Sequence, residues 1–106
     1  MIELIVEFDP ILEREDYWRI EVRCATDIKK GDRFITVVPY TTKLIENNTK
    51  CLQNEGTPFG VDLVVDRIRS YEKEWDILYA GMTAMIFFNG DASKIKARAY
   101  LRDILQ

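Results

Sequence analysis

One apolar run limits the fold of this chain more than any other stretch. It extends from Tyr79 to Gly90, reads YAGMTAMIFFNG, and has Gly81 and Gly90 near its two ends. An apolar run between two glycine turns is typical of a buried strand. We therefore expect the stretch 61–90 to fold as strand, long loop and strand, with the rest of the chain arranged around it.

Alternation of apolar and polar side chains predicts further strands. Tyr17–Cys24 has the clearest pattern, with arginine and glutamate at the positions between apolar ones. The segment 2–6 mostly follows the same rule, 33–38 is expected to be the next strand, ended by Pro39, and 41–45 is compatible with a short strand. The apolar face of the clearest strand consists of Trp18, Ile20, Val22 and Cys24.

The connections between these strands have turn chemistry. Lys30-Gly31-Asp32 offers a residue that tolerates positive φ and a carboxylate that can bond to the backbone, as a tight reversal requires. The charged segment Leu12–Asp16 is expected to be a solvated loop or a short helical turn. Asn47-Asn48 and 54–60 have loop chemistry, and 47–59 is expected to be an exposed loop.

Two segments are harder to assign. Between 61 and 79, apolar residues recur at helical spacing, but the β-branched Val61–Val65 follows a glycine, which favours a strand. After Gly90, Asp91 or Ser93 can cap a helix that runs through Ile104. Its weak apolar stripe would be Ile95, Ala99 and Leu101 or Arg102.

Composition limits the function classes. A chain of 106 residues is expected to be a single domain, 1–106, and its net charge of −3 argues against a large basic face for nucleic acid. The chain has no histidine, which removes the usual general base and most catalytic zinc sites. With no signal peptide or membrane-spanning run expected, the cytoplasm is the default location. Cys24 and Cys51 are expected to be buried free thiols.

One basic and aromatic group could bind a partner. Trp75 and Tyr79 with three nearby cations could form a stacking platform for a single-stranded nucleic acid. An aromatic loop packed over one end of the fold, or a protein-binding surface, agrees better with the acidic net charge. The cations are Arg67, Arg69 and Lys73.

No catalytic constellation, metal site or cofactor site is expected. The acidic residues Glu13, Glu15 and Asp16 could in principle bind a metal, but no further ligands converge on them in sequence, and a solvated acidic loop is the better interpretation.

Three segments in order resemble the second domain of translation elongation factors such as elongation factor Tu. The segment 28–34, IKKGDRF, is similar to a turn that joins two strands in that family, and 64–68 is similar to the strand before a loop. The segment 80–90 resembles a further family strand, although Met82 and Met85 stand where the family has aspartate and glycine. The resemblance covers residues 17–90, and no phosphate-binding loop of a GTPase accompanies it.

The resemblance implies a mainly β fold, a small antiparallel β-barrel of six or seven strands over 1–90, to which a C-terminal α-helix over 91–106 is added. It also favours a strand over 61–70, followed by a loop at 73–76. We expect a non-catalytic binding module that contacts another protein, of an immunity or regulatory type. The alternative is a translation- or RNA-associated module that binds RNA or the ribosome. A small enzyme is the weakest of the three hypotheses, no membrane partner is expected, and the oligomeric state is left open.

Overall fold

The protein folds as a mainly β, antiparallel structure. The computed structural model describes residues 1–45, 49–53 and 56–104, and within 41–53 only the backbone is described. No α-helix occurs in these residues. The strands are β1 (Glu3–Val6), β2 (Ile11–Arg14), β3 (Tyr17–Cys24), β4 (Ile28–Lys29), β5 (Arg33–Val38), β6 (Thr41–Ile45), β7 (Thr49–Gln53), β8 (Phe59–Ser70), β9 (Lys73–Trp75), β10 (Ile77–Leu78), β11 (Thr83–Asn89) and β12 (Tyr100–Arg102).

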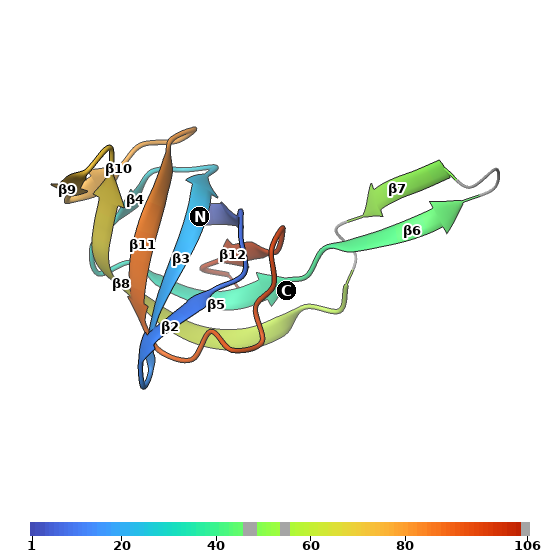
Figure 1. The fold of residues 1–106 in the computed structure, drawn as a ribbon, viewed down its shortest axis with the longest axis horizontal. Coiled ribbons are helices and arrows are strands. Elements are labelled where there is room, and N and C mark those ends of the chain that lie inside the picture. Colours follow the sequence, from blue (N-terminus) through green and yellow to red (C-terminus); the bar gives the residue numbers. More distant parts are fainter. Residues whose placement is uncertain (46–48, 54–55, 105–106) are drawn as a thin grey trace.

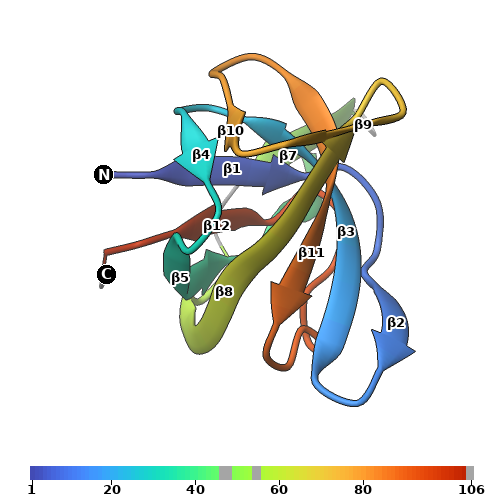
Figure 2. The ribbon, with the colours of Figure 1, turned by 90° about the vertical axis from the view of Figure 1, so that its left-hand side faces the viewer.

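Six of the strands form a closed ring of antiparallel pairs. The order is β1, β12, β5, β8, β11 and β3, and β3 pairs again with β1. The ring is visible in Figure 2, where β1 lies beside β12 and β8 beside β11. The first and last strands of the chain meet at Leu4 and Leu101, which are partners in the β1–β12 ladder.

The core fills the inside of this ring because strand side chains alternate between the two faces. Ile20, Val22 and Cys24 of β3 are buried, while Glu21 and Arg23 between them are exposed. Phe34 and Phe88 meet edge to face at 6.0 Å between ring centroids. The largest fully buried side chains are Phe34, Phe88, Leu4, Ile20, Ile28, Leu63, Ile68, Leu78, Ile86, Ile95, Leu101 and Val6.

Several strands lie outside the ring. β2 continues the sheet beyond β3, β9 pairs with the end of β8, and β4 pairs with β10. The β6–β7 hairpin projects from the body in Figure 1 and contributes to a long axis of 46 Å against 26 Å for the other two.

The predicted C-terminal helix over 91–106 is wrong for the residues described. Residues 91–99 form two turns, closed by hydrogen bonds from Ile95 N to Ala92 O and from Ala99 N to Lys96 O, and β12 follows. Arg98 has φ 74, which no right-handed helix accommodates. The apolar residues of the expected stripe are indeed buried, but ring closure between β1 and β5 requires a strand at 100–102. The division of the chain at residue 90 therefore falls inside the ring.

The central segment forms a long strand, as the resemblance indicated. β8 covers Phe59–Ser70 and lies between β5 and β11. The strand predicted for 61–70 is therefore confirmed, and the helix suggested by the spacing of the apolar residues does not form there. The loop predicted at 73–76 is wrong, because Lys73–Trp75 forms β9 and folds back on β8. Ile11–Arg14 is likewise the exposed strand β2 and not the loop or helical turn expected. The loop predicted over 47–59 is also wrong at Thr49–Gln53, which pairs with β6, and at Phe59, where β8 begins.

The other short predictions agree with the structure. The strands expected at 2–6, 17–24, 33–38 and 41–45 are present. Gly31 has φ 88, and Asp32 Oδ2 accepts a hydrogen bond from Lys29 N at 2.8 Å. Cys24 is a buried free thiol, and burial raises its pKa to about 12. The side chain of Cys51 lies outside the described residues.

Candidate functional site

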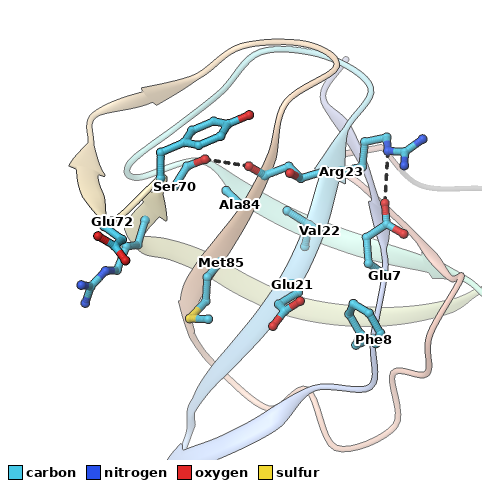
Figure 3. A pocket seen from close by; sticks show the side chains of 12 residues that line it. Glu7, Phe8, Glu21, Val22, Arg23, Ser70, Glu72, Ala84 and Met85 are labelled. Atoms are coloured by element: carbon cyan, nitrogen blue, oxygen red, sulfur yellow. Dashed lines mark hydrogen bonds and ion pairs between the residues drawn. The ribbon is translucent and has the colours of Figure 1, made fainter.

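A groove crosses the outer face of the ring over strands β3, β11 and β8. Its volume is about 530 Å³, and Figure 3 shows it from close by. Its floor carries the outward side chains of Glu21, Thr83, Met85 and Arg69, which alternate with the core residues of the same strands. The remaining lining residues are Glu7, Phe8, Val22, Arg23, Ser70, Tyr71, Glu72 and Ala84.

Two exposed aromatic side chains form the walls of the groove. Phe8 follows β1 and is 63% exposed, and Tyr71 follows β8 and is 77% exposed. In the ring, β1 and β8 are separated by β3 and β11, so the two walls stand about three strand spacings apart, or roughly 14 Å. Large aromatic side chains with free faces are the residues that most often anchor a protein partner.

Tyr71 is held in an unusual backbone conformation. The β8–β9 hairpin turns through Tyr71 and Glu72, whose φ angles are 53 and 62. Two successive residues with positive φ are the mark of a type I′ turn, for which asparagine and glycine are strongly preferred. A bulky residue in this region costs on the order of 1–2 kcal/mol. A strained turn that presents an exposed ring is a reason to suspect a binding role.

Hydrogen bonds fix this hairpin against the neighbouring strand. Ser70 Oγ donates to Thr83 O at 2.8 Å (Figure 3), and Trp75 Nε1 donates to Ser70 O at 2.9 Å. Ser70 is buried although it is polar, and these contacts satisfy it. The turn that carries Tyr71 is therefore anchored at its base.

The groove contains charges of both signs. Glu7 Oε1 and Arg23 Nε form an ion pair at 3.1 Å (Figure 3). Glu21, Arg69 and Glu72 form no ion pair with any residue that the structure describes. Three carboxylates and two guanidinium groups around an apolar centre can bind a polypeptide segment of mixed character, but they hold no excess of positive charge for a phosphate chain.

The residues predicted to form a platform are divided between two sides of the hairpin. Arg67 and Arg69 lie on the outer face, and Arg69 lines the groove. Trp75 stands opposite Ile68 and packs against the core, with its ring nitrogen bonded to Ser70 O. Lys73 is exposed at the end of β9, and Tyr79 is exposed in the turn before β11. The structure does not bring the five into one stacking surface.

Arg67 is already engaged by its neighbours. Its guanidinium forms two hydrogen bonds with Glu74, at 3.0 and 3.1 Å, and lies 4.8 Å from the centroid of the Phe87 ring. These hydrogen bonds lower the pKa of Glu74. The pair leaves less of the Arg67 charge available to a partner than the sequence suggested.

A second aromatic group on the outer face was not found from the sequence. The Tyr17 and Phe87 rings stack at 6.0 Å between centroids, and the Arg14 guanidinium lies 3.8 Å from the centroid of the Tyr17 ring. Arg19 Nε lies 3.2 Å from Glu13 Oε1, but this nitrogen makes no hydrogen bond, so the contact is one of charge alone. This group covers the end of the outer face that carries β2.

Phe8 and Tyr71 line the groove but were not predicted from the sequence to belong to a site. Phe8 stands between two acidic residues in front of Pro10, a place where an apolar side chain has no strand to bury it. Tyr71 falls inside the apparent helical stripe of 61–78, which concealed that it ends a strand. The signal for Phe8 was present in the sequence, whereas that for Tyr71 depended on the secondary structure of the whole segment.

Among the described residues, no three side chains of histidine, cysteine, aspartate or glutamate gather in a way that could hold a metal ion. The same residues contain no helix of the length and apolar character needed to cross a membrane. Comparisons of the chain with models of protein families, with curated proteins and with solved structures found no match.

Proposed function

We propose that this protein is a non-catalytic binding module that grips an extended segment of another protein in the groove between Phe8 and Tyr71. The observation that carries the proposal is the pair of exposed aromatic walls, one of them in a strained turn, on either side of an open floor. An extended segment could lie across the floor, place side chains against the two rings and meet the unpaired Arg69, Glu21 and Glu72.

Two wider features agree with a regulatory or immunity-type role. The net charge of −3 suits a module that masks a basic partner. The free thiol of Cys24 suits a reducing compartment such as the cytoplasm.

The experiment is a selection of displayed random peptides on the whole protein, followed by affinity measurements on variants. Phe8→Ser should weaken the selected peptides at least tenfold, because an aromatic anchor is removed. Tyr79→Ser is the matched control, since Tyr79 is an exposed aromatic residue outside the groove and its loss should leave binding unchanged. Equal binding by the Phe8 variant and the unchanged protein would reject the groove.

The closure of the ring into a barrel is a second proposal. We infer that the ring is a closed β-barrel like the second domain of translation elongation factors. The ring of pairs and the tight turn at Gly31 support this. A nuclear Overhauser effect between the Cα protons of Ile5 and Tyr100 tests closure, because these residues form a non-hydrogen-bonded pair, with close Cα protons, only if β1 meets β12. Its absence in a folded sample would leave an open sheet.

RNA is the second candidate partner. The observation that favours it is the stacking of Arg14 on Tyr17 and of Arg67 on Phe87, since cation and ring pairs of this kind can also stack on bases. The pairing of Arg67 with Glu74 weighs against it. A mixed-sequence RNA of twelve nucleotides serves as the probe. RNA binding that weakens steeply with salt and is lost in Arg67→Ala/Arg69→Ala would establish RNA as the partner. RNA binding that changes neither with salt nor in this variant would reject it.

A further inference from the structure

Strand β2 has a free edge. Ile11–Arg14 pairs with β3 on one side, and no strand among the described residues pairs with the other side. Figure 2 shows β2 at the margin of the sheet, beyond β3. All four residues of β2 are exposed. The backbone groups along this edge are therefore open to a further strand.

Two of the four side chains of β2 are large, apolar and exposed. Ile11 is 49% exposed and Leu12 is 55% exposed. Free edges normally carry charges, proline or a bulge that discourage pairing. Here Pro10 precedes the strand, and the charged Glu13 and Arg14 occupy its second half, where the register also shifts, so Ile11 and Leu12 form the unprotected half of the edge. These two apolar residues are consecutive, so they point to opposite faces of the sheet.

Charge decides between a second copy and a different partner. Residues 9–16 contain four carboxylates, Asp9, Glu13, Glu15 and Asp16, and one arginine, a formal charge of −3. Arg19, which lies opposite Ile11 and pairs with Glu13, reduces this to −2 around the two apolar residues. Pairing of β2 with β2 of a second copy would set these acidic margins against each other. A strand with basic margins would meet them with attraction.

We propose that β2 accepts an extended basic segment of another protein by strand addition. The segment has two consecutive apolar residues, one for Ile11 and one for Leu12, flanked on both sides by lysine or arginine. Backbone hydrogen bonds to the free edge supply the affinity, and the acidic margins select the flanks. The inference rests on the proposed function in treating the chain as a protein-binding module, but no residue of β2 lines the groove.

The probe is a fluorescent peptide, Lys-Lys-Thr-Val-Ile-Thr-Lys-Lys, titrated with the whole protein. There are two control peptides. In the first, glutamate replaces all four lysines; the second keeps the lysines and carries N-methyl groups on both the Val and the Ile amides. Consecutive amides point to opposite edges of a strand, so the methylated peptide has no intact central edge. The protein variants are Ile11→Thr/Leu12→Thr, which keeps one β-branched residue and adds another, and Glu15→Gln/Asp16→Asn, in which asparagine suits the φ of 54 at residue 16.

We expect the lysine peptide to bind and both control peptides to fail. The Ile11 and Leu12 variant should weaken binding roughly tenfold or more, and the Glu15 and Asp16 variant should weaken it most at low salt. Tyr71→Asn, in the groove, should leave this peptide unaffected, which separates this result from a failure of the proposed function. The idea is overturned if the lysine peptide does not bind, if a control peptide binds equally well, or if the Ile11 and Leu12 variant, folded by circular dichroism, binds unchanged. A dimer that the same variant dissolves would instead identify a second copy as the occupant.

Discussion

The hydroxyl of Tyr17 donates a hydrogen bond to Asp66 Oδ2 at 2.6 Å and joins β3 to β8 across β11. A bulge makes the contact possible. In the β11–β8 ladder Phe87 pairs with Arg67 and Phe88 with Val65, so Asp66 is the extra residue and its carboxylate turns to the outer face. Tyr17 is only 5% exposed although it lies on that outer face, because the Phe87 ring and the Arg14 guanidinium cover it.

This contact predicts a loss of stability at alkaline pH. Burial, and then the hydrogen bond to Asp66, raises the pKa of Tyr17 above its ordinary value of 10.0. The folded state therefore holds this proton more tightly than the unfolded state, and the stabilisation is complete below about pH 10 and is lost as the pH rises above it. Tyr17→Phe should lower the free energy of unfolding by about 1 kcal/mol at pH 7. Above pH 10 the difference between the two proteins should shrink.

Urea unfolding of both proteins from pH 7 to pH 11 measures this difference and cancels the titration of other groups. If the difference in free energy of unfolding between the two proteins stays constant or grows with pH, the alkaline loss of stability does not come from the Tyr17 hydroxyl.

Gly90 and Gly31 should respond very differently to alanine. Gly90 has φ 128, and an added Cβ would lie 2.2 Å from Asp62 O. Gly31 has φ 88, but a Cβ there would meet nothing within 4 Å. We expect Gly90→Ala to cost about 3 kcal/mol or more, through strain and a backbone clash, and Gly31→Ala about 1 kcal/mol, through strain alone. Thermal unfolding measures the loss of stability in each variant. Equal losses would show that the backbone at Gly90, after β11, can move away from Asp62 to accommodate the added Cβ.

Glu3 and Arg102 stabilise the seam where the two ends of the chain meet. Arg102 Nε lies 3.2 Å from Glu3 Oε2, and both side chains are 17% exposed. A double-mutant cycle with Glu3→Gln and Arg102→Met should give a coupling of about 1–2 kcal/mol, between the values for exposed and for buried pairs. The control is Arg33 with Asp62, a pair that is 62% and 70% exposed and should couple by less than about 0.5 kcal/mol. Equal couplings would mean that the seam pair is as solvated as the control.

The strands that alternate strictly were predictable from sequence, and the reason is local. Tyr17–Cys24 buries alternate residues inside the ring from Ile20 to Cys24, so its side-chain period is visible without knowledge of its neighbours. The last strand could not be found this way. Tyr100–Arg102 contains three residues and becomes a strand because β1 and β5 supply partners on both sides, a tertiary effect that outweighs a capped, lysine-rich helical pattern.

The candidate site was predictable only in part, for a similar reason. Arg69 was identified from its place in a basic and aromatic segment, and it does line the groove. Trp75 belongs to the same segment, but the hairpin at Tyr71 and Glu72 sets it opposite Ile68, on the core side. Glu7, Glu21 and Glu72 come from three distant parts of the chain, and only the ring order brings them to one face.

The strained turn at Tyr71 predicts opposite effects on stability and binding. Tyr71→Asn keeps the turn geometry but suits its positive φ far better, so it should raise the free energy of unfolding by about 0.5–1 kcal/mol. The same change removes one wall of the groove and should weaken groove-selected peptides about tenfold or more. Urea unfolding and fluorescence titration measure the two effects on one protein.

Tyr79→Asn is the control, because Tyr79 is also an exposed tyrosine but lies outside the groove and does not have a positive φ. It should change neither stability in this direction nor peptide affinity. A more stable Tyr71 variant that binds as before would show strain without function. A less stable variant would show that the Tyr71 ring makes contacts that outweigh the strain of its backbone. The combination of gain and loss is the result expected of a residue kept in a costly conformation because a partner needs its ring.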